Sequence, residues 1–159
     1  MNNFVHLHVH SQYSLLDGQA SISNLVDRAI NDGMKAIALT DHGSMFGVKE
    51  FFNYVKKKNS KYDGTIKSLK AELKELQQHE DSEEKNSKIE ELKSKIKEEE
   101  SHKFKPIIGC ECYVAHRGRK YKEGKPDMSG WHLIVLAKNL QGYKNLIKMV
   151  SHSWTEGYY

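Results

Sequence analysis

The chain opens on alternating apolar and polar positions. Residues 4–10 place their aliphatic side chains on one face and Phe4 with three histidines on the other, which predicts a β-strand. A helix is predicted from the N-cap candidate Ser21 to a stop at Gly33, because apolar residues recur there at helical spacing. The apolar segment 36–40 then predicts a second strand, and so completes a strand–helix–strand unit.

The same alternation of elements continues through the second half of the chain. Apolar residues from Val48 to Val55 recur at helical spacing and predict a second helix. Residues 107–115 and 132–137 predict two further strands, and residues 140–150 predict a last helix. This order of elements is typical of a parallel α/β fold.

Residues 59–103 interrupt that order, since they consist almost entirely of Lys, Glu, Ser, Leu and Ile. Two apolar series have the three–four–three spacing of a heptad seam: Ile66, Leu69, Leu73 and Leu76, then Ile89, Leu92 and Ile96. The polar residues 79–87 separate them, so we expect an antiparallel helical hairpin inserted into the fold. A solvated protrusion and a docking surface both fit it, and Lys and Glu are too mixed for a basic face.

Composition limits the classes of protein that fit. The 159 residues suffice for one domain with a core, while 29% charged residues and a mean hydropathy of -0.72 place part of the chain outside it. No apolar run is long enough to span a bilayer. Cys110 and Cys112 are too close for an easy disulfide, which favours the reducing cytoplasm. A net charge of +4 permits an anionic partner without requiring one.

The first strand carries candidate metal ligands. Residues two apart in a strand point to the same side, so His8 and His10 reach one point in space. At the carboxyl end of a parallel barrel strand, that point is where such folds keep their chemistry. Neutral imidazole is a ligand for Zn, Mn or Fe, and Asp17 on the next loop adds a carboxylate. The alternative is that these are ordinary surface or core histidines.

The second strand ends in "LTDHG", which exposes His42 at the same end of the fold. Asp41 beside it is placed either to bind a metal or to orient an imidazole. We take Asp41 and His42 as candidate catalytic residues. A helix cap formed by Asp41 or Ser44 is the competing interpretation, and both can hold together.

The third and fourth strands add one residue each. In "GCEC", alternation puts Glu111 on one face and both cysteines on the other. If Glu111 faces the interior, burying its carboxylate requires a metal or a positive neighbour. A Cys-x-Cys metal site is the rival. The fourth strand opens with His132. Histidines and acids at four strand ends indicate a multi-metal site that hydrolyses a phosphate ester.

Four segments together resemble a known family: "HLHVHS", "LLDG", "LTDHGSMFG" and "KPIIGCECYV". They resemble the PHP (polymerase and histidinol phosphatase) superfamily. More narrowly, "SQYSLLDG", "MFGVKEFF" and "HLIVLAKNLQGYKNLIKMVS" are similar to the N-terminal PHP domain of bacterial DNA polymerase III alpha subunits. The resemblance covers residues 4–58 and 104–159. The segment 59–103 departs from the usual short connection of the family.

The resemblance implies an α/β fold, namely the N-terminal portion of a distorted (βα) PHP barrel over residues 1–159, with 59–103 as an inserted antiparallel hairpin. It implies a divalent metal cofactor (Zn, Mn or Fe), with up to three ions in the complete domain. By position, the implied ligands are His8, His10, Asp17, His42, Glu111 and His132. Asp41 would orient these ligands without binding the metal itself. Later ligands of the family are expected beyond Tyr159.

The resemblance also implies a function. The chain is expected to be an N-terminal fragment of a cytoplasmic replicative polymerase, a DNA-directed nucleotidyltransferase whose full length binds DNA. Its other expected partners are replicase subunits, among them a proofreading exonuclease subunit. No association with a membrane is expected. The domain itself would act as a metal-dependent 3′–5′ exonuclease. The alternatives are a stand-alone phosphatase for a small phosphate ester and a non-catalytic scaffold.

Overall fold

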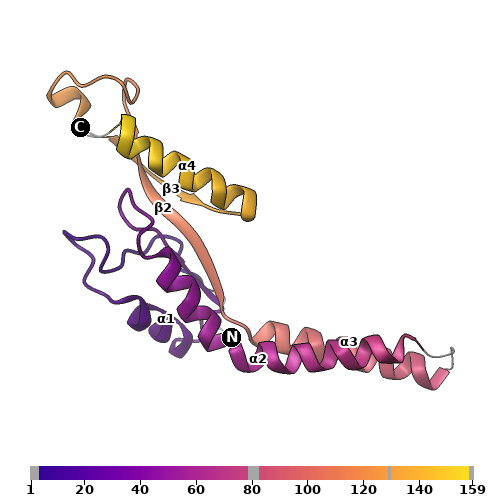
Figure 1. Ribbon diagram of the computed structural model, residues 1–159. Helices are drawn as coiled ribbons and strands as arrows, with labels where there is room; N and C mark the ends of the chain where they lie inside the picture. The colour runs from indigo at the N-terminus through magenta and orange to yellow at the C-terminus, as the bar shows by residue number, and fades with distance from the viewer. Residues whose placement is uncertain (1–3, 79–82, 129, 158–159) are drawn as a thin grey trace. The chain divides into compact units, whose positions relative to one another are not determined.

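The computed structural model describes residues 4–78, 83–128 and 130–157 (Figure 1). The chain divides into two compact units. The first, here called the sheet unit, comprises Met1–Tyr54 and Lys105–Tyr159. The second, the helical unit, is Val55–Phe104. Among the described residues, none of the helices is both long enough and apolar enough to cross a bilayer.

In the described residues of the sheet unit, one sheet has the strand order β1-β2-β3. The elements of this unit are α1 (Ile22–Asn31), β1 (Ala36–Leu39), the start of α2 (Val48–Leu76), β2 (Lys105–Ala115), the 3₁₀ turn η1 (Lys125–Asp127), β3 (Gly130–Leu136) and α4 (Leu140–Glu156). β1 and β2 are parallel, with Ala36 opposite Lys105 and Leu39 opposite Ile108. The mixed α/β class expected from the sequence is confirmed.

β3 departs from the parallel arrangement that the strand–helix–strand–helix order of the first half predicts. It pairs antiparallel with β2, from Gly109 opposite Leu136 to Ala115 opposite Gly130. A parallel neighbour requires a crossover, usually a helix. The described part of the connection between β2 and β3 contains only the short turn η1, so the chain returns as a hairpin.

The predicted strand over residues 4–10 is also wrong. This segment lies along β1, where the Ala38 N–H donates to the His6 carbonyl and the Thr40 N–H donates to the Val9 carbonyl, both at 2.9 Å. The donors Ala38 and Thr40 are two residues apart, whereas the acceptors His6 and Val9 are three residues apart. The bend at residues 7 and 8 accommodates the extra residue. The Val9 N–H donates to Oγ1 of Thr40 instead of to a backbone oxygen. A regular ladder cannot form across this bend.

The core of the sheet unit forms where the sequence places its apolar residues. Ser21 caps α1 by accepting a hydrogen bond from the Asn24 N–H at 3.3 Å, as predicted. The inward face of α1 and the whole of β1 are buried together with the first turns of α2. These buried residues are Ile22, Val26, Ala29, Ala36, Ile37, Ala38, Leu39, Val48 and Phe51.

The helical unit holds the rest of α2 and α3 (Glu83–His102). Ile66 on α2 and Leu92 and Ile96 on α3 are buried, and they belong to the two predicted apolar series. Lys70 pairs with Glu100 at 2.9 Å across the two helices. Of the predicted turn 79–87, residues 79–82 lie outside the described residues, and the remainder is already helical.

Candidate metal centre

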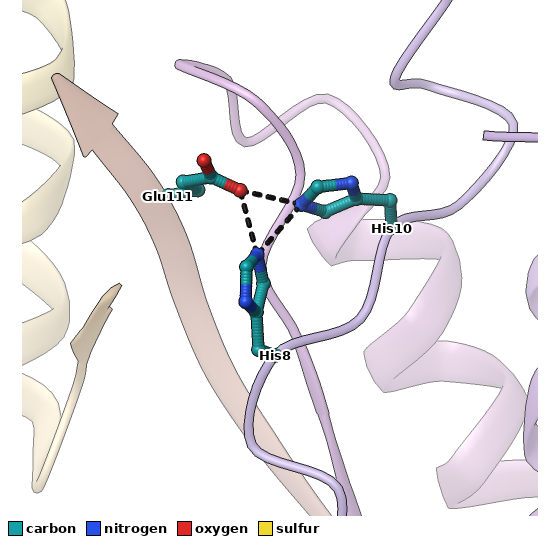
Figure 2. Close-up of side chains that lie close together, drawn as sticks. All are labelled: His8, His10 and Glu111. Atoms are coloured by element: carbon teal, nitrogen blue, oxygen red, sulfur yellow. Dashed lines mark hydrogen bonds and ion pairs between the residues drawn. The ribbon is translucent and has the colours of Figure 1, made fainter. Parts of the chain in front are cut away.

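Three side chains from distant parts of the sequence converge on one point (Figure 2). Nε2 of His8 lies 2.7 Å from Oε2 of Glu111, and Nε2 of His10 lies 2.6 Å from the same oxygen. The two ring nitrogens are 3.0 Å apart. His8 and His10 come from the bent segment along β1, and Glu111 comes from β2. Two imidazoles and a carboxylate so arranged form a set that could hold a metal ion.

Glu111 is the most deeply buried acid of this group, with 1% of its side chain exposed. Burial by itself would raise the pKa of Glu111. The hydrogen bonds from His8 and His10, together with the charges of His42 and His10, outweigh burial and bring the pKa below its ordinary value. The carboxylate is therefore held in its charged, metal-binding form.

The second oxygen of Glu111 also faces an imidazole. Oε1 is buried, and Nδ1 of His132 lies 2.5 Å from it as an ion pair. Imidazole nitrogens therefore surround both oxygens of this buried carboxylate. Such a mixed set of nitrogen and oxygen donors fits a divalent metal.

A second group lies beside the first. Oδ2 of Asp17 is 2.8 Å from Nε2 of His42 and 3.4 Å from Nδ1 of His10. The hydrogen bond with His42 lowers the pKa of Asp17, with a smaller contribution from His10. The ring centroids of His10 and His42 are 3.9 Å apart. His10, Asp17 and His42 are thus another trio of suitable spacing, and His10 belongs to both trios.

Strand direction explains how the group assembles. The chain after β1 continues alongside β2, where His42 forms a bridge with Glu111. The Gly43 N–H donates to the Glu111 carbonyl at 2.8 Å, and the φ angle of Gly43 is 55°, a value that favours glycine. His132 is at the start of β3. Because β3 is antiparallel, its start lies at the carboxyl end of β2, opposite Tyr113.

Asp41 holds the loop that carries Asp17. Its Oδ1 accepts from the Ser11 N–H at 2.6 Å and from Oγ of Ser14 at 2.9 Å, and its Oδ2 accepts from Oγ of Ser11 at 2.9 Å. Oγ of Ser14 in turn accepts from the His42 N–H at 3.1 Å. Asp41 therefore orients the backbone around the histidines rather than an imidazole ring.

Close packing of the same loop requires a glycine. A Cβ atom at Gly18 would lie 1.8 Å from the Ser11 carbonyl oxygen. No side chain fits at that distance, so Gly18 lets the chain turn back tightly after Asp17. Close packing against Ser11 therefore explains why the "LLDG" segment ends in glycine.

Three hydroxyl-bearing residues were missed by the sequence reasoning. The Tyr113 hydroxyl forms a hydrogen bond with Nδ1 of His42, and Ser11 and Ser14 bind Asp41. Tyr113 is two residues after Glu111 on the same strand, so its side chain points to the same side. That spacing was the available signal. Hydrogen bonds of this kind orient metal-binding histidines.

The cysteines do not join the group. Cys110 is fully buried, and its hydrogen bond with Cys112, together with burial, raises the pKa of its thiol. Neither cysteine belongs to the two metal-sized trios among the described residues. Buried free cysteine of this kind packs as a small apolar residue.

Three further histidines of the described chain have no part in the two trios. His102 stacks on Tyr62 in the helical unit, His116 packs edge-on against Trp131, and His152 pairs with Glu156. His79 lies outside the described residues.

Comparison with known families decides the classification. The PHP domain family matches residues 6–159, nearly the whole chain. The chain belongs to the PHP domain family. This PHP domain therefore combines the family's sequence pattern with a cluster of histidines and acids in which His8, His10 and Glu111 are in direct contact.

Curated relatives of this PHP domain are replicative polymerases. It is 36% identical to a DNA polymerase III subunit alpha from Borreliella burgdorferi over 99% of its length, and 37% identical to that of Treponema pallidum, also over 99%. Identity to the Chlamydia pneumoniae protein is 32% over 98%. The PHP domain spans about a tenth of the length of each relative, between 9% and 10%.

Proposed function

We propose that this PHP domain is the N-terminal part of a DNA polymerase III alpha subunit and that it hydrolyses phosphodiester bonds with bound divalent metal. Within the complete protein it would serve DNA replication by removing nucleotides from a mismatched 3′ end. The observation that carries the metal proposal is the buried carboxylate of Glu111, with one oxygen between two imidazole nitrogens and the other 2.5 Å from Nδ1 of His132.

The proposed architecture is the N-terminal portion of a distorted (βα) barrel, with residues 59–103 as an inserted antiparallel hairpin. The identity to alpha subunits supports it, as do the parallel pairing of β1 with β2 and the separation of Val55–Phe104 as its own compact unit. We further propose replicase subunits, including an exonuclease subunit, as partners and the cytoplasm as location, because the relatives are replicative polymerases.

Each residue has a distinct part in the proposed chemistry. His8, His10 and Glu111 would hold one ion, with His42, Asp17 and His132 holding neighbouring ions. A neutral imidazole binds a metal through one nitrogen, so His10 serves one trio at a time. When bound, a divalent metal supplies an acidified water and neutralises phosphate charge. Zn, Mn and Fe all suit this mixed set of nitrogen and oxygen donors.

The protein's own groups complete the site. The hydrogen bond between the Tyr113 hydroxyl and Nδ1 fixes the ring of His42 with Nε2 facing Asp17. In the metal-binding tautomer, Nδ1–H donates to the hydroxyl and Nε2 keeps its lone pair for the ion. Asp41 keeps the backbone of the TDHG turn in place through Ser11 and Ser14. His42 is 28% exposed and His8 is 52% exposed, so both present an open side to a substrate phosphate.

Metal content of the purified chain tests the proposal. The wild type should retain divalent metal after gel filtration without chelator, and the double variant His8→Ala/His10→Ala should retain none. The matched control His102→Ala/His152→Ala removes two histidines outside the centre and should keep the metal. A wild type that binds no metal would overturn the proposed centre.

Hydrolysis then separates the candidate functions. Release of nucleotides from a mismatched primer by the metal-loaded wild type, abolished in the double variant, supports exonuclease action. Cleavage of a small phosphate monoester alone indicates the phosphatase alternative. Bound metal without either activity indicates a scaffold, and contradicts the hydrolytic proposal.

A further inference from the structure

A strongly basic loop follows β2. Residues 116–125, here called the basic loop, contain five Lys and Arg residues and one acid, Glu123. The sheet unit has twelve Lys and Arg residues in all, so almost half of its fixed positive charge lies in this loop. Such a concentration points to an anionic partner.

Two arginines give the loop its conformation. Arg117 pairs with Asp127 at 2.6 Å and with Glu123 at 2.9 Å. Arg119 pairs with Glu156 at the end of α4 at 2.7 Å. These pairs tie the loop to itself and to α4. The loop also carries three lysines whose side chains are exposed: Lys120, Lys122 and Lys125.

The basic loop begins close to the metal centre. It follows Ala115, four residues after Glu111 on β2, a distance of about 13 Å along the strand. A cavity of about 690 Å³ is lined by His42 and His132 of the metal centre and also by Asp127 and Met128, which follow the basic loop. The metal centre and the residues that flank the loop, Ala115 before it and Asp127 after it, therefore line one shared space.

Exposed aromatic side chains lie beside the lysines. Tyr121 within the loop is 52% exposed, and Trp131 on β3 is 68% exposed. The Arg117 guanidinium lies 5.2 Å from the centroid of the Tyr121 ring. Positive charge next to exposed aromatic rings is the combination with which proteins bind single-stranded nucleic acids, since unpaired bases stack on the rings.

We propose that the basic loop binds the phosphate backbone of a single-stranded nucleic acid and leads its end into the cavity beside the metal centre. The proposal rests on the proposed function, because it names the strand on which the metal centre would act. Trp131 would stack on a base of the bound strand.

Binding without metal tests the proposal separately from catalysis. Fluorescence anisotropy of a short labelled oligothymidylate is measured in EDTA, with the wild type and with Lys120→Gln/Lys122→Gln/Lys125→Gln. We expect at least tenfold weaker binding for the triple variant. We also expect the slope of log K against log salt to fall by about 2, or roughly 0.7 for each phosphate that a lysine no longer neutralises.

The matched control removes the same charge from the helical unit. Lys67→Gln/Lys74→Gln/Lys97→Gln takes three exposed lysines from α2 and α3 and should change the affinity by less than twofold. Equal losses of affinity in both variants would overturn the assignment to the loop, since net charge alone would then explain binding. Displacement of the DNA by polyglutamate at equal charge concentration would also overturn it, in favour of an acidic protein partner.

Trp131 tests the preference for single strands. Trp131→Ala should weaken oligothymidylate binding about tenfold, and Trp131→Phe should restore most of it because a ring remains for stacking. Equal wild-type affinity for a duplex of the same length would contradict the single-strand assignment. A wild type that binds the oligothymidylate but takes up no divalent metal would refute the proposed hydrolysis while leaving the basic loop's role intact.

Discussion

The two units of the chain place their charged residues in opposite ways. In the sheet unit, Glu111 and Asp41 are almost completely buried, and each is met by several polar groups from other segments. In the helical unit, pairs such as Glu91–Lys95 lie along one helix face, with more than half of each side chain exposed. The helical unit contains thirteen lysines against twelve acids, so its charges nearly cancel.

This difference shows where charge reports function. An exposed pair one helical turn apart contributes only about 0.3–0.5 kcal/mol and needs no ligand to explain it. A buried carboxylate is costly unless its partners compensate it. A protein retains that cost where the charge has a task, and the task proposed here is metal binding. The number of charged residues is therefore a poorer guide than their burial.

The largest effect is expected at Glu111. Glu111→Gln keeps the size of the side chain but removes the charge that His8 and His10 face, so metal affinity should fall at least hundredfold, or about 2.7 kcal/mol. Titration calorimetry with Zn²⁺ or Mn²⁺ measures it. The exposed Glu98→Gln on α3 removes the same charge and should bind as the wild type does. Equal affinity of all three proteins would remove the contrast between the units.

The second effect concerns stability in the helical unit. Leu92 is 3% exposed, and Leu92→Ala should cost about 2–4 kcal/mol of unfolding free energy, because apolar packing is removed and a cavity is left behind. Urea denaturation followed by circular dichroism measures this cost. Exposed Ser94→Ala is the control. Metal affinity should change less than twofold, and a parallel fall in metal affinity would show that the two units are coupled.

A smaller effect is expected at Tyr113. Tyr113→Phe removes the hydroxyl that is hydrogen-bonded to Nδ1 of His42 while leaving the ring in place, so metal affinity should fall about tenfold. Tyr62→Phe on α2 makes the same change in the helical unit and should have no effect on metal. An unchanged affinity in Tyr113→Phe would mean that His42 is oriented by Asp17 alone.

The smallest effect is in acid titration. Arg117 lowers the pKa of Asp127, and Lys95 lowers the pKa of Glu91 in the helical unit. A lowered folded-state pKa adds stability that is present above the ordinary carboxyl pKa and is lost as pH falls through the folded value. NMR titration should therefore give Asp127 a midpoint below about 3.9. Arg117→Gln should raise it, and Lys95→Gln should do the same for Glu91.

Absence of either rise would show that the corresponding ion pair is not formed in solution. The buried carboxylates of the sheet unit would then be the charges that contribute to stability, and the exposed ion pairs would not.

Much of the candidate metal centre was predictable because its residues are spaced as they would be in strands that end at one edge. His8 and His10 are two apart, and His42 and Glu111 each sit where an apolar segment reaches the same edge of the sheet. These side chains converge because their segments end at the same edge of the sheet, and this does not require regular backbone pairing. The bend at residues 7 and 8 therefore leaves the convergence intact, although the alternation of residues 4–10 gave no reason to expect a bend.

The direction of β3 could not be predicted from its own residues, since an apolar strand reads alike in both directions. The missing crossover helix between β2 and β3 was the available clue. Ser11, Ser14 and Tyr113 were missed for another reason. Hydroxyl side chains are common in loops and on strands, and only the fold shows which of them face Asp41 or His42.

The two hydrogen bonds between Asn59 and Phe104 bear on the order of folding. The Asn59 side chain accepts from the Phe104 N–H at 2.9 Å and donates to its carbonyl at 2.8 Å, so the helical unit is closed at its base by its own residues. His8 and Glu111 are 103 positions apart in sequence. Once local helix formation has closed the segment between Asn59 and Phe104, the effective loop between His8 and Glu111 is little more than half as long. Loop-closure entropy grows slowly with length, so the long excursion delays assembly of the metal centre far less than its residue count implies.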